Sequence, residues 1–133
     1  MNRTVLIADG DLNAQIIAET LLRLRGVDVR LAADGTEACQ VARDEDVAVV
    51  VLELSLPGMN GFEVLRRLRG RFEPSRVAKP PRIIAVTHRS EPEVERFVRR
   101  LGADAFLCKP LAPRQFIGMV EDLLAGVVPQ RAA

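Results

Sequence analysis

The feature that most constrains the fold of this 133-residue chain is an alternation of short apolar runs with helical patterns. Several of the runs are apolar almost throughout, which is typical of parallel strands buried on both faces. We predict strands at residues 3–8, 27–31, 47–52, 82–86 and 105–107. Because parallel strands joined by helices need right-handed crossovers, the alternation predicts a doubly wound α/β domain of three layers.

The predicted helix that follows the fourth strand has the clearest ends. Ser90 and Glu93 have capping-box spacing, Pro92 falls in the first turn, and Gly102 follows the last turn. A single apolar stripe at helical spacing should face the core. Its members are Val94, Phe97, Val98 and Leu101.

The other helices are marked by period and by Gly or Pro at their ends. The first should end at Gly26, the second span about 36–43, the third about 61–72, and the fifth run from Pro113 to Gly126. Core-facing residues are expected to be Ala14, Ile17, Leu21 and Leu24 in the first helix, and Phe116, Met119, Val120 and Leu123 in the fifth.

Polar side chains follow four of the predicted strands by one or two residues. They are Asp9, Glu53, Thr87 and Lys109. In open α/β sheets, sites form at the carboxyl ends of the strands. We therefore expect these four groups to converge on one rim of the sheet and to form the functional site.

Four segments together are typical of one protein family. They are VLIADGD, VLELSLPGMNGFEVLRRL, IIAVT and GADAFLCKP. With these motifs the chain resembles the receiver domain of bacterial response regulators over about residues 5–124. The resemblance implies a flavodoxin-like (βα)5 sandwich with a parallel five-stranded sheet in the order 2-1-3-4-5. It also implies a domain at residues 1–126 and a tail or linker at 127–133.

The resemblance implies a set of site residues as well. In that family, two adjacent acids after strand 1 and an aspartate after strand 3 hold Mg²⁺, and the aspartate becomes an acyl phosphate. A hydroxyl after strand 4 and a lysine after strand 5 bind the phosphoryl group. By position, Asp9 is the first acid, Glu53 and Ser55 complete the metal set, Thr87 and Lys109 are the phosphate-binding residues, and Phe106 is the switch aromatic.

The chain departs from this pattern at two positions of the site. Gly10 stands where the second acid is expected, and Glu53 stands where the phosphoacceptor aspartate is expected. One extra methylene moves a carboxylate by roughly 1.5 Å, and a misplacement of about 1 Å can cost about 10²-fold in a reaction that depends on alignment. Mg²⁺ demands near-octahedral oxygen geometry, so we expect it to bind weakly, and we expect no other cofactor.

Asp11 is the remaining acid of this acidic pocket. It could partly replace the missing metal ligand, but its place at the start of the first helix favours an N-cap. The longer Glu53 side chain, in contrast, should reach Lys109 and Thr87 directly. Such a charge could bias a switch without phosphate, and the alternative is a structural ion pair in a decayed site with no regulated state.

We therefore predict a receiver-like signalling module, a pseudo-receiver, that is not an enzyme and acts by phosphorylation-independent protein–protein interaction. One alternative is a working receiver that a histidine kinase still phosphorylates with Mg²⁺. Another is the regulatory domain of a larger transcription factor or kinase. Metal titration and acetyl-phosphate labelling separate the first alternative from the prediction.

The resemblance implies a protein partner such as a signalling kinase, a regulator or an effector domain, and composition by itself names no partner class. The net charge is +1, with 28% charged residues, and no run of 18 apolar residues occurs. Neither nucleic acid nor a membrane is therefore an expected partner, and we expect a cytoplasmic location. The interaction face should lie on the fourth helix, where Glu91, Glu95, Arg96 and Arg99 are expected to be exposed.

Three further features have plain structural interpretations. The Arg-rich stretch at residues 66–76 is typical of a solvated helix face, since no aromatic residues are placed there for stacking on bases. His88 is expected to be an exposed polar residue, and Cys108 a small buried residue of the fifth strand. The long connection at residues 70–81 has no assigned role.

Overall fold

Residues 2–70 and 80–127 are described by the computed structural model. Their core is one parallel sheet in the order β2-β1-β3-β4-β5. The strands are β1 (Thr4–Ala8), β2 (Asp28–Ala32), β3 (Val49–Glu53), β4 (Arg82–Thr87) and β5 (Ala105–Cys108). The predicted doubly wound fold and strand order are confirmed.

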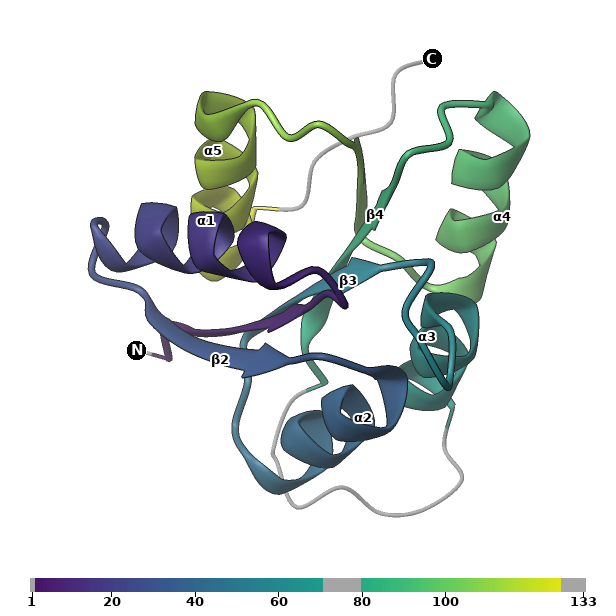
Figure 1. Ribbon diagram of the computed structural model, residues 1–133, viewed down its shortest axis with the longest axis horizontal. Coiled ribbons are helices and arrows are strands. Elements are labelled where there is room, and N and C mark those ends of the chain that lie inside the picture. The colour runs from purple at the N-terminus through teal and green to yellow at the C-terminus, as the bar shows by residue number, and fades with distance from the viewer. Residues whose placement is uncertain (1, 71–79, 128–133) are drawn as a thin grey trace.

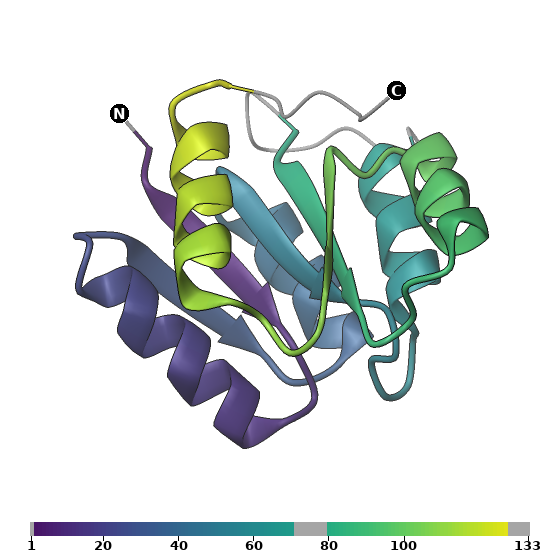
Figure 2. The same ribbon diagram turned by 90° about the horizontal axis from the view of Figure 1, so that it is seen from above.

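Five helices cover the two faces of the sheet (Figure 1). They are α1 (Leu12–Arg23), α2 (Gly35–Asp44), α3 (Gly61–Arg69), α4 (Pro92–Leu101) and α5 (Pro113–Leu124). Figure 2 shows α1 and α5 on one face and α2, α3 and α4 on the other. The three predicted layers are therefore present.

Alternate residues of each strand feed two separate cores, as the period of a strand requires. Val5 and Ile7 of β1 pack with α1 and α5, whereas Leu6 and Ala8 pack on the opposite side with α2, α3 and α4. All four side chains are at most 2% exposed. A strand that is apolar on both faces fits only the middle of a covered sheet, and β1 is flanked by β2 and β3.

The strand register aligns the carboxyl ends of the central strands. Ala8 pairs with Leu52, and Glu53 pairs with Val86. Asp9 and Lys109 directly follow β1 and β5, as predicted. Glu53 and Thr87 differ slightly from the prediction, because each is the last residue of its strand and remains in the sheet.

The predicted core face of the first helix is only partly right, because Leu21 packs against the core but Ile17 and Leu24 do not. Its buried residues are Gln15, Ala18 and Leu22, whereas Ile17 is 61% exposed and Leu24, at the C-cap, is 78% exposed. Apolar residues occur on two adjacent faces of this helix, so their period alone does not fix which face is buried. The Gln15 side-chain amide donates to the Asp9 carbonyl at 2.6 Å and turns the neighbouring face inward.

The predicted capping box of the fourth helix is wrong. Its N-cap is Glu91 and makes no side-chain cap hydrogen bond, while Pro92 opens the first turn. Gly102 does end the helix, with a φ of 114° that favours glycine. Phe97 is not a core residue, because it is 50% exposed and packs its ring 5.7 Å from that of Phe62.

The third helix is shorter than predicted, ending at Arg69 with Gly70 as its C-cap. The predicted end at residue 72 and residues 71–76 of the Arg-rich stretch lie outside the described residues. Arg66 and Arg67 are exposed and both pair with Glu63, which fits the solvated face predicted for this stretch.

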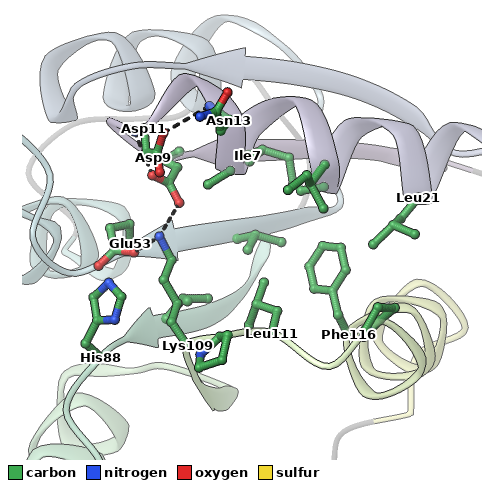
Figure 3. Close-up of a pocket in the computed structure, with 18 residues that line it drawn as sticks. Ile7, Asp9, Asp11, Asn13, Leu21, Glu53, His88, Lys109, Leu111 and Phe116 are labelled. Atoms are coloured by element: carbon green, nitrogen blue, oxygen red, sulfur yellow. Dashed lines mark hydrogen bonds and ion pairs between the residues drawn. The ribbon is translucent and has the colours of Figure 1, made fainter.

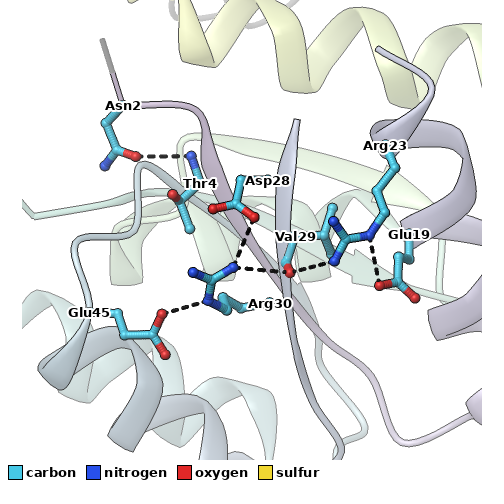
Figure 4. A network of polar contacts seen from close by, with 8 residues as sticks. All are labelled: Asn2, Thr4, Glu19, Arg23, Asp28, Val29, Arg30 and Glu45. Carbon is cyan, nitrogen blue, oxygen red and sulfur yellow. Dashed lines mark hydrogen bonds and ion pairs between the residues drawn. The ribbon is translucent and has the colours of Figure 1, made fainter. Parts of the chain in front are cut away.

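Surface ion pairs lie on and next to the outer strand β2 (Figure 4). Arg30 bridges Glu45 and Asp28 at 2.7 and 2.9 Å, and Arg23 pairs with Glu19 at 2.9 Å. Exposed pairs of this kind contribute little to stability because water screens them. Among the helices in the described ranges, none has the length and apolar character needed to span a bilayer.

Candidate functional site

The centre of the carboxyl edge of the sheet is a cluster of three charged side chains, which we call the carboxyl-edge triad: Asp9, Glu53 and Lys109. The Lys109 Nζ lies 2.8 Å from Asp9 Oδ2 and 2.6 Å from Glu53 Oε2 (Figure 3). The three side chains are only 14%, 11% and 5% exposed for Lys109, Asp9 and Glu53. The predicted Glu53–Lys109 pair therefore forms, and Asp9 joins it.

The other oxygen of each carboxylate is also engaged. Asp9 Oδ1 accepts from the Asp11 amide at 2.9 Å, and Glu53 Oε1 accepts from the Ser55 hydroxyl at 2.9 Å. Glu53 Oε2 is buried and accepts no hydrogen bond of good geometry. Its close contact with the Lys109 ammonium is therefore an ion pair without the geometry of a hydrogen bond. Of the four carboxylate oxygens of the triad, it alone accepts no hydrogen bond.

The two carboxylates keep Lys109 charged. Burial lowers the pKa of Lys109, but the hydrogen bond that its ammonium donates to Asp9, and the contact with Glu53 and the charges of both carboxylates, outweigh this effect and raise the pKa above its ordinary value. Two carboxylates close to an ammonium favour its charged form. The triad carries one net negative charge in total.

Thr87 does not contact Glu53, contrary to the prediction. Its side chain is buried, but the hydroxyl accepts from the Arg89 amide at 3.2 Å and so serves the turn that follows β4. Only the backbone links it to the triad, since the Lys109 amide donates to the Thr87 carbonyl at 2.7 Å. The extra methylene of Glu53 directs the carboxylate toward the longer lysine side chain instead.

Gly10 leaves space that the next loop fills. A Cβ at this position would lie 2.8 Å from Pro57 Cδ and 3.3 Å from Pro57 Cγ. Because a proline ring cannot swing away as a flexible side chain does, any larger residue here requires the loop after β3 to move. Asp11, as predicted, is the N-cap of α1 and accepts from the Asn13 amide at 3.0 Å.

These residues do not fit a tight Mg²⁺ site as they stand. Asp9 and Glu53 share the Lys109 ammonium, and the Ser55 hydroxyl donates to Glu53. Within residues 2–70 and 80–127, no three His, Cys, Asp or Glu side chains are grouped as ligands for a metal ion. A hard cation needs several oxygen ligands, and here the lysine lies between the two nearest carboxylates.

The other predicted residues lie around the triad in different settings. Phe106 is half-buried against the core on the α2, α3 and α4 side. His88 is exposed, as predicted, and Cys108 is only partly buried, with its Sγ 3.6 Å from the Arg89 carbonyl. Within the described residues, none of these three makes a side-chain hydrogen bond or ion pair with the triad, although His88 lines the same cavity.

The predicted interaction face needs one correction. Glu91 and Arg96 on α4 are exposed, but the Arg99 side chain is only 15% exposed. It pairs with Glu95 at 2.8 Å and donates to the Asp104 carbonyl at 3.3 Å. Arg99 therefore ties α4 to the loop before β5 and does not present its charge to a partner.

Sequence reasoning missed a cavity beside the triad. This α1–α5 cleft has a volume of about 340 Å³ and lies between α1 and α5 (Figure 3). Its walls are mainly apolar, and polar groups gather at the end nearest the triad. The residues that line it include Ile7, Val51 and Val86 of the sheet, Ala14, Ile17 and Leu21 of α1, Leu111 and Phe116 near or on α5, and Asp9, Asp11, Glu53, His88 and Lys109. Ile17 could have indicated the cleft, but the apolar period of α1 assigned it to the predicted core.

A model of the response regulator receiver domain family matches residues 5–121. The chain belongs to this family. Receiver domains are signalling modules, generally not enzymes, that interact with proteins such as histidine phosphotransfer proteins and kinases.

Solved structures agree with this assignment. The receiver domain of a Francisella response regulator is 25% identical, with a TM-score of 0.84 over 94% of this chain and 98% of that one. A CheY-like receiver domain protein of Methanospirillum hungatei is 26% identical, with a TM-score of 0.81 over 95% and 96%. A Saccharomyces cerevisiae receiver domain, solved with a histidine phosphotransfer signalling protein, shares the fold at 22% identity, with a TM-score of 0.81 over 92% and 88%.

Proposed function

We propose that this receiver domain is a pseudo-receiver, which signals through protein contacts that do not depend on phosphorylation. The observation that carries the proposal is the position of the Lys109 ammonium, 2.8 Å from Asp9 and 2.6 Å from Glu53. The positive charge that a phosphorylated receiver must supply to the phosphoryl group is already neutralised by two carboxylates of the same chain.

Two further features support this proposal. Glu53 has one carboxylate oxygen against Lys109 and the other on the Ser55 hydroxyl, so neither oxygen is directed at an incoming phosphorus atom. At Gly10, the Pro57 ring fills the space beside the backbone where the family pattern has a metal-binding acid. Phosphoryl transfer depends on alignment and on charge neutralisation, and both are weakened here.

The expected partner is a protein: a signalling kinase, a regulator or an effector domain. The exposed charges on or next to α4 are Glu91 at its N-cap and Glu93, Arg96 and Arg100; Glu91 pairs with Arg89, and Glu93 pairs with Arg96. Charges of both signs give specificity and orientation more than affinity. Neither direct nucleic-acid binding nor membrane attachment is part of the proposal. The ion pairs of the triad would hold Asp9, Glu53 and Lys109 in one arrangement without phosphorylation by a kinase.

Backbone NMR during titration with Mg²⁺, and then with Mg²⁺ and beryllofluoride, tests the proposal. We expect no saturable shift at Asp9, Glu53 or Lys109 below millimolar Mg²⁺, and no acyl phosphate on Glu53 after incubation with acetyl phosphate. The Lys109→Met variant is the control, since freeing both carboxylates should increase Mg²⁺ binding. Saturation of the parent protein below about 1 mM Mg²⁺, with labelling of Glu53, would instead establish a working receiver.

A further inference from the structure

The α1–α5 cleft has the size and character of a small-molecule site. Ligand sites are typically concave, mostly apolar and about 300–1,000 Å³ in volume, with a few polar groups that fix orientation. The cleft has a volume of about 340 Å³ and is partly open to solvent. At about 30 Å³ per water in the liquid, this is the space of roughly eleven waters, which suits one compact organic molecule.

The depth of the cleft favours a small molecule over a helix of another protein. Its base is formed by Ile7, Val51 and Val86, which belong to three neighbouring strands and are at most 5% exposed. An occupant must therefore pass between α1 and α5 to reach the sheet. A helix is about 10 Å wide with its side chains and would need the two helices to separate.

The walls suit an apolar body. Ala14, Ile17 and Leu21 of α1 face Leu111 and Phe116 across the cleft. Ile17 is 61% exposed. Covering Ile17 and the partly exposed Ala14, Leu21 and Leu111 would remove apolar surface from water, which is the main source of affinity for a small apolar ligand, whereas Phe116 is already buried.

The polar end suits a positive charge. Asp9, Asp11 and Glu53 line it with three carboxylates, and Lys109 supplies one ammonium. The N-termini of α1 and α5 each add about half a positive charge, so an excess of about one negative charge remains. Asp11 uses Oδ1 for the helix cap, while its Oδ2 makes no hydrogen bond within the described part of the chain.

We propose that the α1–α5 cleft binds a small organic cation, with an apolar body against Ile7, Ile17 and Phe116 and an ammonium head beside Asp11. The site adjoins the triad, but it requires neither phosphate nor a metal ion. The proposal therefore goes beyond the signalling mode inferred above, and either can fail without the other.

A matched set of probes tests the charge preference. 4-Phenylbutylamine, 4-phenylbutan-1-ol and 4-phenylbutyrate share one apolar body and carry a positive, a neutral and a negative head. Titrated against the full chain and followed by backbone NMR, the amine should saturate with a Kd of about 1 mM or lower. The alcohol should bind about fivefold more weakly, and the carboxylate should not saturate.

Two variants with matched controls test the location. Asp11→Asn keeps a good N-cap but removes the charge, so it should weaken amine binding about fivefold and leave the alcohol unchanged. Asp34→Asn makes the same change at the N-cap of α2, away from the cleft, and should have no effect. Ala14→Phe should fill the cleft and abolish binding of both probes, whereas Thr20→Phe adds the same ring to an exposed position of α1 outside it.

The shifts should be largest at Ile7, Val51 and Phe116. Equal affinity for the amine and the carboxylate, or amine shifts confined to the exposed Leu12 and Ile16, would overturn the proposal. So would the absence of saturation by the amine up to about 10 mM, or shifts that depend only on protein concentration and so indicate a second copy of the chain. If Ala14→Phe fails to fold by circular dichroism, the Asp11 and Asp34 pair decides the outcome alone.

Discussion

The two edges of the sheet each carry a cluster of three charges, and the clusters are opposite in design. At the amino edge, Asp104 lies between two guanidiniums, those of Arg69 at 2.5 Å and Arg82 at 3.2 Å. At the carboxyl edge, Lys109 lies between two carboxylates. One cluster has a net positive charge and the other a net negative charge.

The clusters also differ in how completely the backbone satisfies them. Asp104 accepts from the Ile83 amide at 2.8 Å, and Arg69 donates to the carbonyls of Gly102 and Pro81, each at 2.8 Å. Burial lowers the pKa of Arg69, and the charge of Asp104 opposes that change. In the triad, by contrast, Glu53 Oε2 accepts no hydrogen bond. The amino edge is a clamp on α3, β4 and β5 that backbone hydrogen bonds complete, whereas the carboxyl edge holds its charges by ion pairs between side chains beside the cleft.

The largest effect should come from breaking the amino-edge clamp. Asp104→Ala leaves the half-buried Arg69 guanidinium and the Ile83 amide without their acceptor, so we expect a loss of about 3 kcal/mol in the free energy of unfolding. Urea denaturation followed by circular dichroism measures it. Asp28→Ala, which removes an exposed partner of Arg30, is the control and should change stability very little. Equal effects of the two variants would show that the clamp is not structural.

The carboxyl-edge triad should be weaker and coupled. Lys109→Met leaves two buried carboxylates close together and should cost about 2 kcal/mol at neutral pH, and Glu53→Gln about 1 kcal/mol. The double variant should be less destabilised than the sum, with a coupling of about 1 kcal/mol. Additive losses in denaturant titrations would mean that the 2.6 Å contact between Lys109 and Glu53 contributes nothing to the free energy of unfolding.

The pH dependence of the triad follows from the raised pKa of Lys109. A folded-state pKa above the unfolded value means that the folded protein holds its proton more tightly. The stabilisation is therefore complete below the unfolded pKa of about 10.4 and is lost as pH rises through the folded pKa. The stability difference between the parent and Lys109→Met should hold between pH 7 and about 10 and shrink above it.

The parts of the molecule that were predictable are those set by repeated patterns. The apolar runs predict the strands and place Asp9, Glu53 and Lys109 at one edge, because parallel strands end together, whereas the strand order followed from the family resemblance. The amino-edge clamp was not predictable. Arg69 and Asp104 are 35 residues apart, and no periodic pattern relates an arginine at the end of a helix to an aspartate before a strand.

The errors within the site have local causes. On α1 the buried face includes Gln15, whose side chain donates to the Asp9 carbonyl, together with Ala18 and Leu22, and this polar contact is not visible in the apolar period. The error in this face concealed the α1–α5 cleft. Thr87 was expected to meet Glu53, but its hydroxyl is used by the turn that follows β4. Single polar contacts of this kind leave no trace in the spacing of residues.

The smallest expected effect separates packing from charge at the carboxyl edge. Gly10→Ala adds no charge, but its Cβ would lie 2.8 Å from the Pro57 ring, so the loop after β3 must shift. Overpacking of this kind costs typically about 1 kcal/mol or somewhat more. Gly118→Ala on α5 is the matched control, because no atom lies within 4 Å of its added Cβ and alanine favours the helix. That variant should gain about 0.5 kcal/mol. Thermal and urea unfolding should therefore show opposite signs for the same one-carbon change, and a gain for Gly10→Ala would mean that Pro57 yields freely and leaves room for an acid at residue 10.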